Sequence, residues 1–362
     1  MRAAYGEKLR TFLACKTNPL LLIDFAGVKV FESATVDTNI LLFEKAKNAH
    51  HTICAATNKQ NRDSLKNLSV FVQQQGSPCD FSGGDSWVIM TPIEQSIKRK
   101  IESVGVPLKD WNIQINYGIK TGYNDAFIIT SQKRDEILSN CSSEEERSKT
   151  DEIIRPILRG RDIKRYSYDW ANLWLIWVPW HFPLHNDTSI QGASERAEQA
   201  FQAQYPALYK HLSAYKKELS ARNKAETGIR YEWYALQRWG ANYWEEFMRP
   251  KIIYREIGFE MDACIAPANW FVNNKLYLIT GDNIEYLLAF LNSKVFNKII
   301  LASANLTGGK GVDFMEKVKV PREQSLMEAV VNTNDERQID AQFNEFFGLT
   351  EAEKQFLSGD SL

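Results

Sequence analysis

Two short segments, residues 116–130 and 154–166, limit most strongly what this chain folds into. They read NYGIKTGYNDAFIIT and IRPILRGRDIKRY. Gly118 and Gly122 permit backbone conformations and close approaches that a Cβ would forbid. We therefore expect a turn at residues 120–124 that lies against a ligand.

The side chains of both segments suit contacts with nucleic acid. The expected turn offers charge for phosphate, hydrogen-bonding groups and a stacking face, from Lys120, Thr121, Tyr123 and Asn124. The second segment offers cations that suit phosphate, and its arginine forks also suit guanine edges. These cations are Arg159, Arg161, Lys164 and Arg165. The plainer interpretation is a hairpin and a solvated charged face, and composition alone does not decide between the two.

Further cations interleave with aromatic residues downstream. The segment 231–244 is aromatic-rich, and core packing is the favoured role for most of its rings, with base stacking as the alternative. The cations near it are Arg230, Arg238, Arg249, Lys251 and Arg255. Lys251 and Arg255 lie four apart in a strand-like run, so they face the same side. Lys310, in the loop 305–311, either touches phosphate or lies in a surface turn.

The two segments, in this order and separated by an acidic linker, resemble the TaqI-like C-terminal specificity domain. That domain is the target-recognition part of adenine-specific DNA methyltransferases and of restriction enzymes that fuse methylation and cleavage. The resemblance continues through residues 231–257, 287–293, 318–321 and 339–356 and covers residues 105–358 in all. It implies that the 231–257 region lies beside DNA.

The first hundred residues resemble the end of the methyltransferase domain itself. Residues 2–13, 20–31 and 34–44 are similar to its last helix and last two strands. Such enzymes bind S-adenosylmethionine at a glycine-bearing turn and hold adenine with an Asn-Pro-Pro-Tyr or Asp-Pro-Pro-Tyr motif. Neither motif occurs here, since Asn18-Pro19 is followed by two leucines. We therefore expect the back part of a larger enzyme, with no cofactor in this chain and with S-adenosylmethionine, and Mg as a further candidate, in the parent enzyme.

Composition sets weak limits on function. The net charge of −1 argues mildly against nucleic-acid binding, although acidic clusters at 133–152 and 335–362 leave the 153–165 and 210–255 regions basic. The 5 cysteines lack metal-ligand spacing and suit reduced thiols, which favours a cytoplasmic protein. Apolar stretches such as 173–179 are too short to span a bilayer.

The pattern of apolar residues predicts a mixed α/β fold with an antiparallel or mixed sheet. We expect a methyltransferase-like remnant with a linker helix at residues 1–104 and a target-recognition domain with a closing helix at 105–362. Thr91 and Pro92 suit the start of the linker helix. The expected strands are 69–73, 113–117, 126–130, 173–179, 251–257, 263–266, 270–272 and 276–279. The expected helical regions are 193–220 and 282–301.

Other constellations favour structural roles. His181 and His185 have the spacing of helical metal ligands, but Pro179 and Pro183 oppose a helix there, so we expect no metal site. No carboxylate pair with a lysine has the spacing of a restriction nuclease, and no Ser-His-Asp set can be assembled. We expect Asp162 to anchor the neighbouring cations by ion pairing or to cap a turn.

Two classes of function follow. In the first, the chain binds double-stranded DNA sequence-specifically as the target-recognition part of a type II restriction-modification enzyme or adenine-specific methyltransferase, and its partner is the missing catalytic region or subunit. In the second, it is a methyltransferase or endonuclease completed by another chain or by a missing N-terminal region. A nonfunctional remnant is a third reading. The missing cofactor motifs favour the first.

Overall fold

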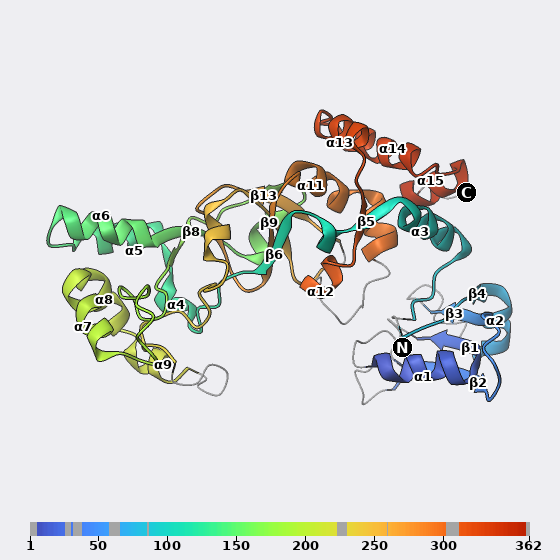
Figure 1. Cartoon of the computed structure of the whole chain (residues 1–362), viewed down its shortest axis with the longest axis horizontal. Helices are drawn as coiled ribbons and strands as arrows, with labels where there is room; N and C mark the ends of the chain where they lie inside the picture. Colours follow the sequence, from blue (N-terminus) through green and yellow to red (C-terminus); the bar gives the residue numbers. More distant parts are fainter. Residues whose placement is uncertain are drawn as a thin grey trace. The chain divides into compact units, whose positions relative to one another are not determined.

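The computed structural model describes residues 6–25, 30–31, 38–57, 66–84, 87–222, 230–258, 260–301 and 311–359, and the fold is mixed α/β with several small sheets (Figure 1). Two compact units occur. Unit 1 comprises Met1–Pro107, Ser293–Lys310 and Lys317–Leu362, and unit 2 comprises Leu108–Asn292 and Gly311–Glu316. The two-domain division at residue 104 stays a prediction, because the C-terminal helices group with the N-terminal residues in these units. No helix in the described ranges combines the length and apolarity needed to cross a membrane.

A four-stranded sheet with the order β2-β1-β3-β4 forms the N-terminal part of unit 1. Its strands are β1 (Asn18–Asp24), β2 (Asn39–Glu44), β3 (Thr52–Ala56) and β4 (Ser77–Cys79). β1 pairs antiparallel with β2 and parallel with β3. Helix α1 (Glu7–Lys16) buries Leu13 and Ala14 in a cluster that also contains Trp87.

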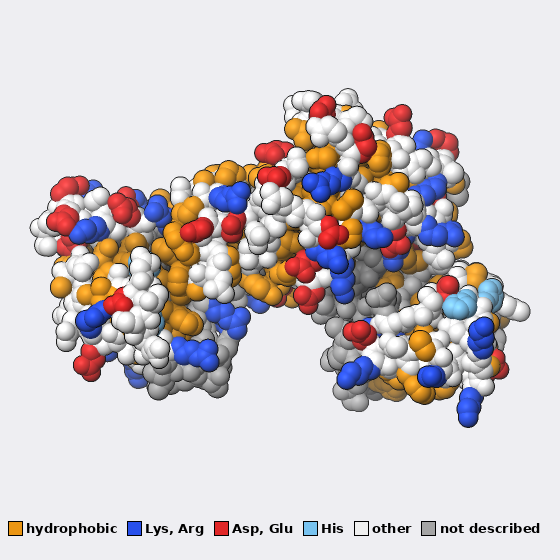
Figure 2. Space-filling view, viewed as in Figure 1, with side chains coloured by type: hydrophobic (Ala, Val, Ile, Leu, Met, Phe, Trp, Pro, Cys, Tyr) orange, Lys and Arg blue, Asp and Glu red, His pale blue; other side chains and the backbone are white. Residues whose placement is uncertain are grey.

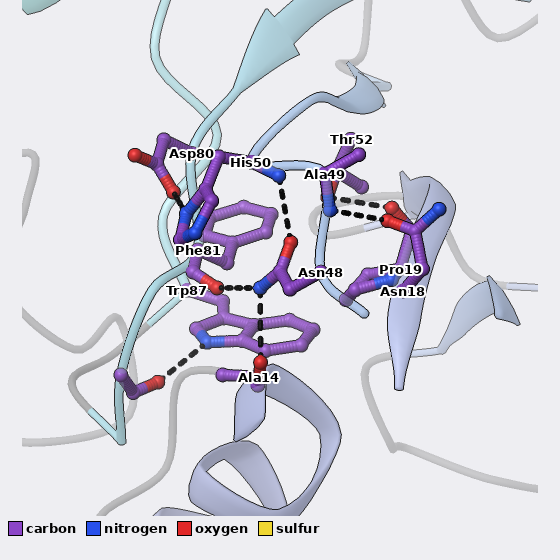
Figure 3. A network of polar contacts seen from close by, with 11 residues as sticks. Ala14, Asn18, Pro19, Asn48, Ala49, His50, Thr52, Asp80, Phe81 and Trp87 are labelled. Carbon is purple, nitrogen blue, oxygen red and sulfur yellow. Dashed lines mark hydrogen bonds and ion pairs between the residues drawn. The ribbon is translucent and has the colours of Figure 1, made fainter. Parts of the chain in front are cut away.

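The turn between β2 and β3 is fixed by a network of polar contacts (Figure 3). The Asn48 amide donates to the carbonyls of Ala14 and Phe81, each at 3.0 Å, and its oxygen accepts from the His50 N–H at 2.8 Å. The His50 ring lies 2.9 Å from Asp80, and both side chains are more than half exposed. Asn48 therefore links three segments, and its role is structural.

The strand predicted at residues 69–73 is wrong, because these residues form helix α2 (Leu68–Gln75). The Asn67 side chain caps the helix by accepting from the Val70 N–H. Phe71 is the buried residue of the helix, and it packs with Ile23 and Ala55 of the sheet. Burial of one aromatic face against the sheet thus overrides the β-propensity of the valines.

Helix α3 (Pro92–Val104) begins as the sequence predicts. Thr91 and Glu94 form a capping box, and Ile97 and Ile101 are the buried residues of the helix. The helix packs with α15 (Glu351–Ser358), where the Lys100 ammonium lies 2.6 Å from Glu353 and 2.8 Å from the Gly348 carbonyl. Also in this unit are α13 (Gln324–Val331), α14 (Glu336–Phe346) and the ribbon of β5 (Gly105–Pro107) with β16 (Lys319–Pro321).

Two four-stranded sheets build unit 2. One has the order β13-β12-β15-β6, is antiparallel throughout, and contains β6 (Ile113–Tyr117), β12 (Lys251–Arg255), β13 (Ala263–Ala266) and β15 (Leu276–Gly281). The other has the order β14-β8-β11-β7 and contains β7 (Ile128–Thr130), β8 (Ile154–Leu158), β11 (Leu173–Ile176) and β14 (Phe271–Val272). A ribbon of β9 (Ile163–Lys164) and β10 (Ser167–Tyr168) lies next to β13. Residues of both sheets share one apolar core.

Helices of unit 2 contribute further residues to this core. They are α4 (Asn124–Phe127), α5 (Ser131–Ser139), α6 (Glu144–Ile153), α7 (Glu195–Gln204), α8 (Pro206–Ser213) and α9 (Lys216–Ser220). Unit 2 also contains α11 (Ile284–Asn292) and α12 (Val312–Met315). The strand predicted at 126–130 is wrong at its start, because Ala126 and Phe127 close the short helix α4 and are fully buried. The helix predicted at 282–301 is interrupted after Asn292, whose side chain exchanges two hydrogen bonds with the Ala263 backbone.

The Lys100–Glu353 pair predicts an acid-sensitive link within unit 1. Burial raises the pKa of Glu353, but hydrogen bonds from Lys100 and Thr350 outweigh burial and lower the pKa to about 2. The carboxylate therefore stabilises the fold above its ordinary pKa of 4.5, and this contribution is lost as pH falls from 4.5 towards 2. Lys100→Met should lower the free energy of unfolding by about 2 kcal/mol at pH 7 and should reduce the loss of stability below pH 4.5. Urea unfolding at several pH values measures both effects.

Lys354→Met provides the matched control, because Lys354 pairs with an 82% exposed Glu351 and should contribute little. Equal effects of the two substitutions would contradict the assignment.

Candidate nucleic-acid interface

The two segments that the sequence analysis singled out adjoin in unit 2. The Ile119 N–H donates to the Val272 carbonyl at 2.7 Å, and the Asn273 N–H donates to the Leu158 carbonyl at 3.1 Å. Strand β14 therefore lies between the end of β8 and the residues that follow β6, and β14 runs parallel to β8. This arrangement brings the cations of both segments to neighbouring loops.

The glycines of the first segment are required by close packing, as expected, but the neighbour is the chain itself. A Cβ on Gly118 would lie 2.0 Å from the Asn273 carbonyl oxygen. Gly122 has a φ of +79°, and a Cβ there would lie 2.6 Å from Cδ of Arg222. The prediction that the turn lies against a ligand stays a prediction.

Arg222 holds this turn in place. No motif in the sequence marks Arg222 for this role. Its guanidinium donates to the carbonyls of Thr121 at 2.9 Å and Ala235 at 2.7 Å, and also to the carbonyl of Trp233. Burial lowers its pKa. Lys120 and Arg238 then exchange two backbone hydrogen bonds, of 3.0 and 2.9 Å. The turn and the aromatic-rich segment are thus joined, and both cations stand at the junction.

The four predicted residues of the turn differ in what they offer a ligand. Thr121 is buried, and its hydroxyl lies 2.7 Å from the Asn124 amide oxygen, so this pair supports the turn. Tyr123 packs on Tyr215 with ring centroids 6.0 Å apart, and burial raises its pKa. Lys120 is half-buried. Of these four, Lys120 is the one that carries a charge for phosphate.

The second segment is held by Asp162. Its carboxylate accepts from Nε and Nη2 of Arg159 at 3.1 and 2.8 Å, and from the Arg159 N–H at 2.8 Å. The expectation that Asp162 caps a turn is confirmed, but the cation that it pairs with is Arg159, and Lys164 pairs with Asp169 instead. Because its fork is occupied, Arg159 is a poorer phosphate ligand than the sequence indicates.

The other cations of this segment are more open to a ligand. Arg161 is exposed. Lys164 pairs with Asp169, but the two side chains are 59% and 71% exposed, so phosphate can replace the carboxylate at little cost. Arg165 is half-buried, with its guanidinium carbon 5.5 Å from the Tyr166 ring centroid.

Lys251 is not available to DNA in this fold, which corrects the sequence-based prediction. It is fully buried in β12, and its ammonium donates to the carbonyls of Pro267 at 2.9 Å and Trp270 at 3.1 Å. Burial lowers its pKa to about 7. Arg255 is partly exposed and pairs with Asp262.

The remaining predicted residues are placed as follows. Arg230 is exposed, and Lys310 lies outside the described residues. The aromatic side chains of 231–244 pack in or against the main core, as the favoured interpretation predicts. Among the described residues, no group of three or more His, Cys, Asp or Glu side chains has the geometry of a metal site.

Lys275 joins the exposed cations and was missed. It lies in the turn between β14 and β15, where its Cβ is 3.7 Å from the position that a Cβ on Gly160 would occupy. Its side chain is 66% exposed and pairs with Glu256 at 3.5 Å. The only sequence signal for it is an Asn-Asn-Lys turn far from either motif.

On the face drawn in Figure 2, Lys and Arg side chains alternate with Asp and Glu side chains rather than forming one continuous basic patch.

The packing at Gly118 gives the first test of this arrangement. Gly118→Ala should lower the free energy of unfolding by about 2 to 3 kcal/mol, because the new Cβ would clash with the Asn273 carbonyl oxygen, which cannot move without the rest of the backbone. Gly160→Ala should change stability by less than about 0.5 kcal/mol, since its Cβ would make an ordinary contact. Denaturant unfolding of both variants measures the difference, and equal costs would contradict the described backbone approach.

The buried ammonium gives a second test. Because the folded-state pKa of Lys251 is near 7 and its ordinary value is 10.5, the unfolded chain binds more protons between these values, and stability rises with pH there. The gain due to Lys251 between pH 7 and pH 9 should be about 2 kcal/mol. It should disappear in Lys251→Met and persist in Lys164→Met. If the free energy of unfolding of Lys251→Met rises with pH as steeply as that of the wild type, the lowered pKa of Lys251 is contradicted.

Known proteins resemble this chain, and one family match includes two of the loops described above. Residues 155–312 match the TaqI-like C-terminal specificity domain. The type II methyltransferase M.PaeR7I of Pseudomonas aeruginosa is 19% identical over 384 residues, a match that covers 99% of this chain and 62% of that protein. The chain therefore spans less than two thirds of this relative.

Two solved structures are also similar. The type IIL restriction-modification enzyme MmeI in complex with DNA has a TM-score of 0.48 and 11% identity, covering 95% of this chain and 45% of MmeI. The type IIG restriction endonuclease BpuSI has a TM-score of 0.44 and 12% identity, covering 99% and 44%. The similarity to the TaqI-like C-terminal specificity domain thus covers residues 155–312, which include the loops 158–164 and 272–276.

Proposed function

We propose that this chain is the DNA target-recognition part of a restriction-modification enzyme and that unit 2 binds the duplex. The observation that carries the proposal is the junction of loops at residues 118–120, 158–164 and 272–276, which gathers exposed cations inside and beside the segment that matches a specificity domain. Loops held on a rigid sheet are the usual place for recognition residues.

The phosphate contacts come from the cations that the fold leaves accessible. These are the exposed Arg161, Lys164 and Lys275, and the half-buried Lys120. Arg159 and Lys251 stabilise the fold instead. Arg230, Arg238 and Arg255 remain candidates for contacts with bases or phosphates. A set of about four phosphate contacts is small, so affinity without base contacts is modest and strongly dependent on salt.

Salt dependence tests the proposal. Four contacts predict that log affinity falls against log salt with a slope of about −3.6. Fluorescence anisotropy with a mixed-sequence duplex measures this slope between about 50 and 200 mM salt. Over this range the affinity should fall by a factor of about 10² or more. The double variant Arg161→Ala and Lys275→Ala should reduce the slope to about −1.8 and weaken binding to all sequences alike.

Lys217→Ala with Lys354→Ala is the control, because both lysines are outside the proposed surface. The control should retain the wild-type slope. A wild-type affinity that does not change with salt, or a double variant that behaves like the control, would contradict the proposal.

We also infer that the S-adenosylmethionine site, and any Mg site for cleavage, belong to the rest of the parent enzyme. The inference rests on the missing glycine-bearing turn and Asn-Pro-Pro-Tyr motif. Isothermal calorimetry with S-adenosylmethionine should give no saturable heat at micromolar concentration. Saturable binding would instead favour a chain that is closer to a complete methyltransferase.

A further inference from the structure

A cleft with unusual chemistry lies in unit 2 at the edge strand β6. Its volume is about 580 Å³. Four side-chain amides line it, from Asn112, Gln114, Asn116 and Asn242, together with Tyr243 and the paired Glu246 and Arg249. Amides carry a donor and an acceptor on one planar group, so a cluster of them suits a ligand that presents both. Neither sequence motif contains most of these residues, and the proposed phosphate contacts leave them unused.

One wall of the cleft is the face of β6 that carries Gln114 and Asn116. These residues are two apart, so their side chains leave the same face of the strand. They stand opposite Thr280 and Leu278 of β15 in the antiparallel register. Because β6 is the last strand in the order β13-β12-β15-β6, no further strand formed by the described residues pairs with its outer edge.

The other wall is the loop after Arg238. Gly240 has a φ of +82°, and a Cβ there would lie 3.2 Å from the Tyr243 ring, so glycine lets this ring pack closely. Glu246 accepts a hydrogen bond from the buried Thr280 hydroxyl and lies 3.4 Å from Arg249. The contact between Thr280 and Glu246 joins the two walls and fixes the width of the cleft.

Asn116 carries an unsatisfied hydrogen-bond donor at the cleft. Its Nδ2 is shielded from solvent and has no hydrogen-bond partner within the residues that the structure describes. A buried amide donor without an acceptor is costly and rare. Rotation about χ2, which is a broad torsion in asparagine, turns either amide atom towards the cleft without backbone movement. Gln114 and Asn242 are exposed beside it and can approach the same ligand.

The cleft is next to the proposed phosphate contacts. Arg238, which exchanges backbone hydrogen bonds with Lys120, is close enough to Tyr243 to influence its ionisation. Burial and the nearby Tyr117 raise the pKa of Tyr243, so this ring is neutral at physiological pH and offers an uncharged face. A duplex held at Lys120 would therefore lie beside the amides.

We propose that this cleft reads the major-groove edge of an adenine in the bound duplex, with Asn116 and Gln114 as the base-reading side chains. Asparagine and glutamine form paired hydrogen bonds with N6 and N7 of adenine, where the amide oxygen accepts from N6 and the amide nitrogen donates to N7. The proposal rests on the proposed DNA-recognition function and adds the site and the base that it reads.

A test uses the full chain and a randomised duplex pool. Selection by the wild type should enrich adenine at one position or more. Replacing that adenine by 7-deazaadenine removes the N7 acceptor and should weaken binding about tenfold, in line with one lost base contact. Asn116→Ala should bind the adenine and 7-deazaadenine duplexes equally, with the salt slope of the wild type retained.

Gln114→Ala is the second variant, because Gln114 is exposed and its loss does not disturb packing. It should reduce the preference for adenine, and the exposed Gln132→Ala on α5 should not. The inference is overturned if the wild type ignores 7-deazaadenine or if both cleft variants keep full discrimination. In those cases salt-dependent duplex binding still stands. If the wild type shows no salt-dependent binding at all, the proposed function fails as well.

Discussion

The guanidinium of Arg222 is the contact on which the candidate interface depends. It replaces water at the carbonyls of Thr121, Trp233 and Ala235, which belong to two segments far apart in the sequence. A buried cation is expensive unless several hydrogen bonds compensate it, and these three carbonyls do so here together with the Leu219 carbonyl, 3.0 Å from Nε. Without this side chain, the turn and the aromatic-rich segment would both expose unsatisfied backbone in the interior. The positions of Lys120 and Arg238 follow from it.

The fold uses many of its cations for its own stability. Arg159 is bound by Asp162, Lys251 lies in the core, and Arg222 links loops. The net charge of −1 counts buried and paired cations together with exposed ones, so it does not measure the charge that this chain presents to a ligand. In the proposed function, a few accessible cations at one junction supply the attraction to phosphate. The amide-lined cleft adds neutral side chains to the arginines that are candidates for base contacts.

The sequence predicted much of the local structure because short-range chemistry decides it. The helix cap at Thr91 and the turn at Asp162 involve residues within a few positions of one another. The strand at 113–117 was also predicted, although its partner β15 is distant in the sequence. Residues 69–73 and Ala126 with Phe127 were misassigned, since burial of Phe71 and Phe127 by distant elements overrides local propensity. The burial of Lys251 also depends on distant backbone.

The candidate site was predictable only in part, for the same reason. Gly118, Lys120 and the 159–165 cations have visible motifs, and the fold brings these two segments together. Lys275, Arg222 and the amides of the cleft have none, because their neighbours lie on other loops and strands. A pattern of isolated Asn and Gln residues becomes a surface only when β6 and the 240–249 loop face each other.

Lysine labelling with and without duplex DNA is the most direct test of whether the loops of unit 2 bind the duplex. An amine-reactive reagent modifies exposed lysines, and mass spectrometry measures the protection of each one. If the loops of unit 2 bind the duplex, DNA should protect Lys120, Lys164 and Lys275, while Lys354 and Lys217 should stay as reactive as in the free protein. Protection spread evenly over all these lysines, or confined to Lys354 and Lys217, would contradict it.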